Sequence, residues 1–165
     1  MRDSLRKARE LLLDVTPLKT DCGKVCGARC CRSLEGEETG MLLFPGEEEY
    51  YLEDPAWKLR ETKSGILAVC PGRCDRKERP LACRIFPLLP VIRGGEVKVA
   101  GDQRAKAVCP LLRQGIRSMD PAFIDAVKEA GRILAGDPEQ RRFMEQLTEE
   151  QDELKSLREK LGGIG

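Results

Sequence analysis

The stretch Cys22-Gly-Lys-Val-Cys26-Gly-Ala-Arg-Cys30-Cys31 places four thiols within ten residues, together with two glycines and no acidic residue. A second segment, running from Cys70 through Cys74 to Cys83, adds three thiols, and Cys109 is the eighth. Thiolates bind soft and borderline metals, and ligands that lie close in sequence reduce the entropy lost when a site forms. The sequence therefore predicts one or two all-thiolate metal sites. The candidate ligands are Cys22, Cys26, Cys30, Cys31, Cys70, Cys74, Cys83 and Cys109.

Composition narrows the class of protein. The chain has 165 residues, of which 41% are hydrophobic and only 4% aromatic, which predicts one domain over residues 1–165 with a mainly aliphatic core. It has no histidine, and this removes the commonest general base and every mixed Cys/His zinc signature. The net charge of +1 predicts no global attraction to nucleic acid or to anionic membranes.

The expected compartment follows from the apolar segments. The first residues lack the apolar core of a signal peptide, and no run approaches the ~18 apolar residues of a membrane span. We therefore expect a cytoplasmic protein without a membrane partner. In that reducing compartment clustered cysteines are more often metal ligands or catalytic groups than disulfides, although disulfide pairing stays an open alternative.

Hydrophobic periodicity and turn residues predict an α+β fold, with terminal helices around a cysteine-rich middle that holds one or two β-hairpins. Ser4 is the expected N-cap of the first helix, and Leu5, Ala8 and Leu12 share one face. The expected elements are a helix over 4–14, a strand over 41–44, an acidic helix start over 45–53, hairpins over 59–70 and 88–100, and helices beginning at Asp120-Pro121 and Asp137-Pro138. The cysteine-cluster core would cover about residues 20–110, and the helical C-terminal part about 111–163.

Cysteine spacing does not choose the metal. The chain contains no CxxC knuckle, which weakens any particular zinc-finger class, but Zn²⁺ needs only four tetrahedral sulfurs. Iron–sulfur clusters are also held by four cysteines, some of them followed by proline, as Cys70 and Cys109 are here. Zn²⁺ and an iron–sulfur cluster such as [4Fe–4S] are therefore both expected cofactors.

Basic side chains surround the thiols. Residues 22–32 and 70–84 hold two acidic residues and eight basic ones, namely Lys24, Arg29, Arg32, Arg73, Arg76, Lys77, Arg79 and Arg84. A Zn(Cys)₄ site or an oxidised [4Fe–4S](Cys)₄ site carries a formal charge near 2−, which guanidinium groups would offset while donating hydrogen bonds to sulfur. A nucleic-acid surface would use the same residues, but no interleaved aromatics are present to stack bases.

The two cysteine segments also resemble a known family. The cluster Cys22…Cys26…Cys30-Cys31, followed by Cys74…Arg79-Pro80…Cys83-Arg84-Ile-Phe86-Pro87, is similar to the zinc- or iron-chelating domain of the CxxCxxCC cysteine-cluster (YkgJ-like) proteins. The second motif of that family reads roughly CxIYexRPxxCRxFP, and its Arg-Pro, Cys-Arg and Phe-Pro pairs stand here in register with one another. The first cluster has three-residue gaps where the family usually has two. The resemblance covers about residues 20–110 and implies a bacterial metal-binding module.

Three hypotheses follow for the function. The first is a non-catalytic metal-binding protein in which Arg79 and Arg84 contact the cofactor, with Arg84 approaching either sulfur or a neighbouring carbonyl. The second is a redox or transferase-type enzyme module that uses an iron–sulfur cluster and leaves one thiol exposed. The third is an adaptor that binds a protein partner through the C-terminal helix, whose Leu147, Leu154 and Leu161 recur at sevens. That stripe is more typical of a helix packed on its own domain.

Cys109 is the ligand farthest from its neighbours in sequence. The hairpin over 88–100 fills most of the interval after Cys83, and a hairpin returns the chain close to where it left, so we expect Cys109 beside Cys83. The alternative is a buried free cysteine that acts as a small hydrophobe.

Overall fold

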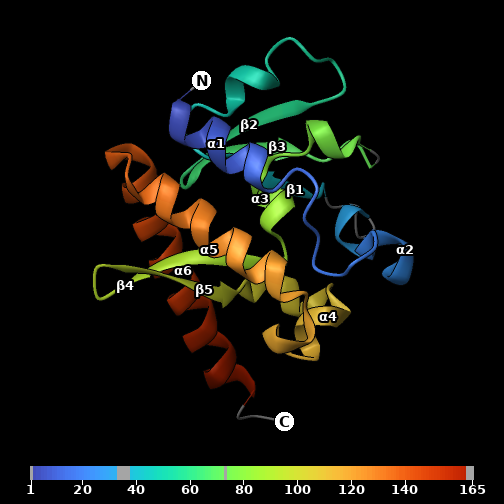
Figure 1. The fold of residues 1–165 in the computed structure, drawn as a ribbon, viewed down its shortest axis with the longest axis vertical. Helices are drawn as coiled ribbons and strands as arrows, with labels where there is room; N and C mark the ends of the chain where they lie inside the picture. The colour runs from blue at the N-terminus through green and yellow to red at the C-terminus, as the bar shows by residue number, and fades with distance from the viewer. Residues whose placement is uncertain (1, 33–37, 73, 163–165) are drawn as a thin grey trace.

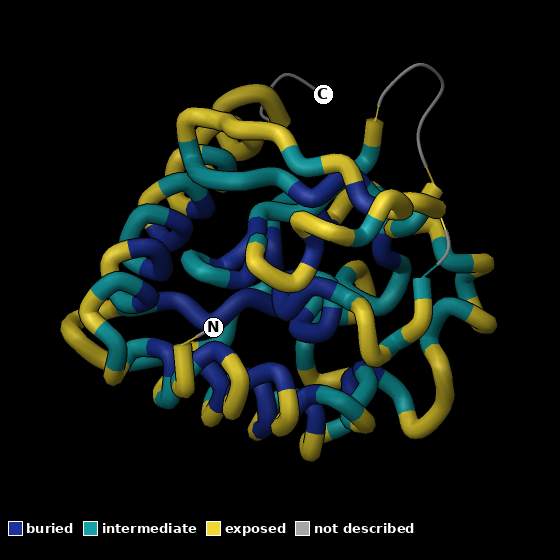
Figure 2. Tube along the Cα trace, turned by 90° about the horizontal axis from the view of Figure 1, so that it is seen from above, coloured by how far each residue is buried: buried dark blue, intermediate teal, exposed yellow. Residues whose placement is uncertain are grey.

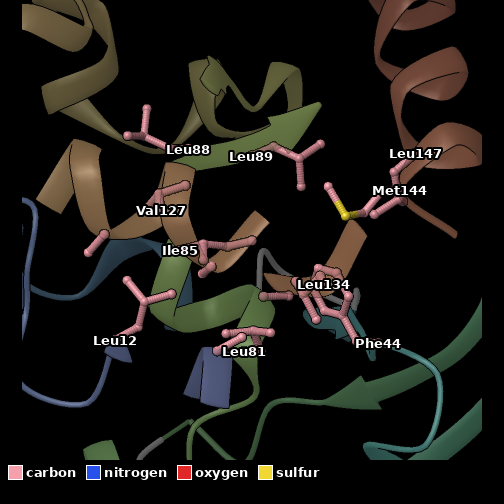
Figure 3. Close-up of a cluster of buried hydrophobic side chains, with 14 of the residues drawn as sticks. Leu12, Phe44, Leu81, Ile85, Leu88, Leu89, Val127, Leu134, Met144 and Leu147 are labelled. Carbon is pink, nitrogen blue, oxygen red and sulfur yellow. The ribbon is translucent and has the colours of Figure 1, made fainter. Parts of the chain in front are cut away.

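A computed structural model describes residues 2–32, 38–72 and 74–162 of the chain. Within them, the larger hydrophobic cluster is lined by α1 (Asp3–Leu11), α3 (Leu81–Ile85), α5 (Pro121–Ala135), the first half of α6 (Pro138–Gly162) and strand β4 (Leu88–Arg93). Figure 3 shows how Leu12, Leu81, Ile85, Val127 and Leu134 meet from these separate elements. The core is aliphatic except for a few aromatic rings, as the composition predicts.

Helix α1 packs its apolar face inward, as its periodicity predicts. Leu5, Ala8 and Leu12 are fully buried. The predicted N-cap is wrong: the helix begins after Arg2, and the Ser4 hydroxyl instead donates to the carboxylate of Asp137. The helix also ends at Leu11, three residues before the predicted end, and Arg76 from the second cysteine segment donates to the carbonyls of the residues that follow it.

A three-stranded antiparallel sheet lies beside this core. Its strand order is β1–β3–β2, formed by β1 (Gly40–Leu42), β2 (Lys58–Thr62) and β3 (Gly65–Val69). The hairpin β2–β3 confirms the prediction for residues 59–70, and β1 covers part of the expected strand 41–44. Tyr51 and Trp57, whose ring centroids are 4.9 Å apart, pack with Leu43 and Ala68 in a second, smaller hydrophobic cluster.

A second predicted hairpin is also confirmed. Strand β4 pairs with β5 (Glu96–Gly101), and both residues of the connecting Gly94-Gly95 turn have positive φ, as a two-residue hairpin turn requires. Helix α5 crosses this hairpin closely. A Cβ atom at Gly131 would lie 2.6 Å from Cβ of Pro90, so only glycine allows this approach.

The C-terminal helices begin where the sequence predicts. Asp120 caps α5 by accepting a hydrogen bond from Ala122 N, and Asp137 accepts one from Glu139 N at the start of α6. Phe143 and Leu147 of α6 are buried, but Leu157 and Leu161 are 54% and 69% exposed. Of the leucines that recur at sevens, Leu147 therefore packs on its own domain whereas Leu161 does not, and Figure 1 shows the last turns of α6 extending away from the other elements.

Helices at both ends enclose antiparallel strands, and this confirms the predicted α+β class. Short helical elements complete the described chain. They are α2 (Cys22–Cys26), α4 (Pro110–Arg113) and the 3₁₀ turns η1 (Arg29–Cys31), η2 (Glu48–Tyr50), η3 (Arg76–Glu78), η4 (Gln103–Ala107) and η5 (Ile116–Ser118). None of the helices in the described part of the chain is both long enough and apolar enough to cross a membrane.

Candidate metal centre

The first four cysteines lie in a segment that folds locally, which we call the cysteine lobe (Asp21–Arg32). Asp21 caps α2 by accepting a hydrogen bond from Gly23 N, and Gly27 ends the helix in the left-handed region. Cys22 and Cys26 therefore lie one helical turn apart on the same side of α2. The turn η1 follows and places the Sγ atoms of Cys30 and Cys31 4.0 Å apart.

The next three cysteines lie on the ligand segment, which we define as residues 70–72 and 74–84. Cys70 follows strand β3, and its N–H donates to the carbonyl of Thr39, 2.7 Å away. The thiol-bearing Cys74 packs against the small aromatic cluster of Tyr51 and Trp57. Cys83 lies within α3, where its neighbours Ala82 and Ile85 are buried. Arg73 lies outside the described residues.

Two arginines fix the ligand segment to helix α1. Arg84 is only 4% exposed, and its guanidinium donates to the carbonyls of Arg9 (2.6 Å), Lys77 (2.7 Å) and Arg79 (3.0 Å). Arg76 donates to carbonyls of the residues that follow α1, including that of Leu12 (3.3 Å). Burial, with help from the neighbouring Arg9 charge, lowers the pKa of Arg84 to about 10. Arg84 thus contacts carbonyls, which is one of the two contacts expected for it, and its contact with a cofactor stays a prediction.

A buried carboxylate that the sequence did not single out completes this anchorage. Glu47 is 0% exposed, forms an ion pair with Arg9, and accepts hydrogen bonds from Leu81 N (2.7 Å) and Phe44 N (3.2 Å). The Leu81 contact holds the start of α3, the helix that carries Cys83. Burial raises the pKa of Glu47, and the Arg9 guanidinium and the two N–H groups oppose this shift.

Tyr51 adds a further contact to the same anchorage. Its hydroxyl donates to the carbonyl of Glu78 (2.7 Å) and receives a hydrogen bond from Arg9 (3.2 Å). Glu47 and Tyr51 belong to the polar run Glu47-Glu48-Glu49-Tyr50-Tyr51, in which no sequence pattern distinguishes a buried residue from an exposed one. Periodicity and composition therefore gave no signal for the hydrogen bonds of Glu47, Arg9 and Tyr51.

Cys83 has the thiols of Cys31, Cys70 and Cys74 among its electrostatic neighbours, and we call these four cysteines the inner group. Burial, followed by the charges of the three other thiols, raises the pKa of Cys83 well above its ordinary value. A hydrogen bond with Cys30 raises the pKa of Cys31 to about 11, while a second one with Cys70 opposes that shift. One member thus comes from the cysteine lobe and three from the ligand segment.

The other four thiols form what we call the outer group: Cys22, Cys26, Cys30 and Cys109. Burial and then the charges of Cys26, Asp21 and Cys109 raise the pKa of Cys22. The hydrogen bond with Cys31 lowers the pKa of Cys30, whose electrostatic neighbours are Cys22, Cys26 and, from the inner group, Cys83. Cys30 and Cys31 therefore lie where the two groups meet.

Cys109 reaches the outer group through the second hairpin. The hairpin returns the chain so closely that Asp102 N bonds to the carbonyl of Pro87, 2.9 Å away. Asp102 then begins η4 and is fixed by Arg104 and Gln151, and Cys109 N bonds back to Ala105 O at 2.7 Å. The buried Cys109 has Cys22 as a neighbouring thiol, and its predicted proximity to Cys83 stays a prediction.

Arg79 is a described cation that hydrogen bonds with one of the thiols. Although burial opposes it, a hydrogen bond with the Cys74 thiol raises the pKa of Arg79, and Cys31 and Asp21 contribute in the same direction. Its Nε atom is buried without a hydrogen-bond partner among the described residues. The predicted contact between Arg79 and a cofactor is compatible with this position, whereas the side chains of Arg76 and Arg84 point to carbonyls.

The donor set fits a thiophilic metal, although the thiols are not in coordination geometry. All eight cysteines are free thiols. Over residues 2–32, 38–72 and 74–162, no group of three or more Cys, Asp or Glu side chains is arranged to hold a metal ion. The inner and outer groups each offer four sulfurs, the number that a Zn²⁺ ion or a [4Fe–4S] cluster requires. Coordination would thus require the thiols to close together.

No family model, no curated protein and no solved structure matches this chain significantly. The resemblance to the cysteine-cluster proteins therefore stays a prediction.

Proposed function

We propose that this chain is a non-catalytic metal-binding protein that holds Zn²⁺ or an iron–sulfur cluster through its eight cysteines, in two four-thiolate sites. One observation carries the proposal. Eight free thiols come from three distant parts of the chain: Cys83 has Cys31, Cys70 and Cys74 as electrostatic neighbours, Cys22 has Cys26 and Cys109, and the Sγ atoms of Cys30 and Cys31 lie 4.0 Å apart. The resemblance of residues 20–110 to a zinc- or iron-chelating family supports the same conclusion.

The chemistry of the donors supports soft or borderline metals. Cys31, Cys70, Cys74 and Cys83 would bind one metal or cluster, and the outer group would bind the other. When bound, the metal would compensate four thiolates and link segments that are distant in sequence. Arg79, which hydrogen bonds with Cys74, would offset part of the remaining negative charge. We place this protein in the cytoplasm, because a reducing compartment keeps thiols available for metal.

A second candidate function is a redox or transferase-type module in which one thiol stays free. The exposed position of Cys30 favours it, because a reactive thiol must be accessible. Eight ligands in two sites leave no free thiol, whereas a single site would leave four. The number of alkylated cysteines in the metal-loaded protein therefore separates the two functions.

Metal analysis of anaerobically purified protein tests the proposal. We expect two zinc ions per chain and no visible absorption, or iron and sulfide with a broad visible absorption. Iodoacetamide should modify none of the eight cysteines until a chelator is added. Each of the variants Cys26→Ser and Cys74→Ser should lose the metal of one group only, and Val25→Ser is the matched control because Val25 lies beside Cys26 and is exposed. Protein that contains no metal, takes up none and exposes all its thiols would exclude this function.

A further inference from the structure

We infer that the metal folds the cysteine lobe (Asp21–Arg32) onto a half-site that the rest of the chain builds without metal. This inference rests on the proposed function and adds an order of events to it. The half-site comprises Cys70, Cys74 and Cys83 on the ligand segment. The lobe supplies the fourth thiol of the inner group, Cys31, and three thiols of the outer group.

The half-site is held by contacts that involve no metal. Strand β3 positions Cys70, and the Tyr51–Trp57 cluster packs against Cys74. Around Cys83, Glu47 bonds to the first N–H of α3, and the buried Arg84 guanidinium joins three backbone carbonyls. Arg76 ties the same segment to the end of α1. A segment with so many buried partners keeps its shape when one ligand is removed.

The cysteine lobe has much weaker support: outside the lobe, the Thr39 hydroxyl donates to the carbonyl of Arg32 (3.2 Å) at an exposed position, and Cys31 hydrogen bonds with Cys70. Neither α2 nor η1 contains a buried residue, and Val25 between its thiols is 63% exposed. Its described backbone–backbone hydrogen bonds join lobe residues to one another, as from Ala28 N to Gly23 O (2.9 Å) and from Cys31 N to Ala28 O (2.9 Å). Figure 1 shows α2 at the right-hand edge of the molecule, and Figure 2 colours that edge as exposed or half-buried.

Local conformation also disfavours the lobe in isolation. Helix α2 has five residues, far fewer than an isolated helix needs in water. Ala28 adopts φ of 53°, in the left-handed region that a residue with a Cβ rarely occupies. Without buried contacts, such a conformation needs another source of free energy. Bonds from the lobe thiols to a metal held by the half-site would supply it, because metal-binding free energy becomes folding free energy when the site is not preformed.

Two regions of the same chain provide an internal comparison for protease digestion. Trypsin cleaves after lysine and arginine. Lys24 and Arg29 lie in the cysteine lobe, whereas Arg76, Lys77 and Arg84 lie in the ligand segment. Loss of metal should therefore expose the first set of sites and leave the second set protected, within one sample.

The experiment is limited trypsin digestion of the full chain, analysed by mass spectrometry. The chain is compared as purified anaerobically, after chelation in the presence of a thiol reductant, and after zinc is added back. We expect cleavage after Lys24 and Arg29 to accelerate at least tenfold on chelation and to slow again with zinc, while cleavage after Arg76 and Arg84 changes less than twofold. In the presence of zinc, Cys26→Ser should show faster lobe cleavage, and the matched control Val25→Ser should not.

Two results would overturn the inference while leaving metal binding intact. Lobe cleavage that stays slow after confirmed metal loss would show that the lobe folds by itself. Equal acceleration in the lobe and the ligand segment would show that the half-site also depends on metal. Metal content measured in the same samples keeps the two proposals apart, because a chain that never binds metal excludes the proposed function and, with it, this inference.

Discussion

Replacing Glu47 by glutamine should destabilise the protein strongly and loosen the helix that carries Cys83. The carboxylate is 0% exposed, is paired with Arg9, and accepts the backbone N–H groups of Phe44 and Leu81. The amide keeps the size of the side chain and one acceptor oxygen, but it removes the negative charge. The Arg9 guanidinium then remains buried without its counter-charge.

The magnitude follows from the contacts that remain. Removing one partner of a buried ion pair costs about 3–5 kcal/mol. We expect the lower end, about 3 kcal/mol, because glutamine keeps the size of the side chain and Arg9 keeps the Tyr51 hydroxyl at 3.2 Å and the Tyr50 ring, whose centroid is 4.5 Å away. At about 2–4 °C per kcal/mol for a chain of this size, the melting temperature should fall by roughly 6–12 °C.

Urea unfolding followed by circular dichroism, at one fixed zinc concentration, measures this effect without a change in ligand linkage. The matched control is Glu53→Gln, which removes the same charge from an exposed residue and should change stability by less than about 0.5 kcal/mol. In a double-mutant cycle with Arg9→Met, the two substitutions should be strongly non-additive. A loss below about 1 kcal/mol for Glu47→Gln, or simple additivity in the cycle, would refute the assigned role of the pair.

Three further predictions concern other parts of the fold. Gly131→Ala should destabilise the protein, because the new Cβ would lie 2.6 Å from Pro90. Overpacking costs about 1–3 kcal/mol, which exceeds the gain of about 1 kcal/mol in helix propensity, and higher stability in urea would contradict this prediction. Arg84→Lys should cost about 2 kcal/mol or more, because one ammonium group cannot reach three carbonyls, and an unchanged unfolding midpoint would argue against that anchorage. Although burial acts in the opposite direction, two N–H groups of α6 and an arginine lower the pKa of Asp137 from 3.8. The ionised carboxylate therefore stabilises the folded protein above pH 3.8, and this stabilisation is lost as the pH falls through the folded-state pKa. Asp137→Asn, which does not titrate, should therefore lose less stability between about pH 4 and pH 2, and parallel acid unfolding curves would disprove this.

The elements that the sequence predicted correctly are those that local chemistry determines. The Gly94-Gly95 turn and the alternation of Val97 and Val99 specify a hairpin without reference to the rest of the chain. Asp120 and Asp137 act as caps because each carboxylate accepts an N–H group of the first helical turn, and a proline follows each at the first helical position.

The features that could not be predicted depend on tertiary contacts. Glu47 and its neighbours Glu48 and Glu49 form one acidic run, and only the position of α1 and α3 buries the first of them. Ser4 is of a residue type that favours the N-cap position, but its hydroxyl donates to Asp137, which is distant in sequence. The grouping of the thiols has the same origin, because it depends on how the lobe and the second hairpin meet the ligand segment.

The basic residues around the thiols illustrate why charge counting alone misassigns roles. The sequence interpretation gave them a common task, the neutralisation of thiolate charge. In the structure Arg76 and Arg84 bind backbone carbonyls, and Arg79 alone among the three contacts a thiol. An arginine that donates to backbone carbonyls still places a positive charge near the thiols. Its position is fixed by those carbonyls whether or not a metal is bound. The same residues can therefore preorganise the half-site and favour thiolates within it, so structural support and electrostatic compensation need not be separate functions of separate residues.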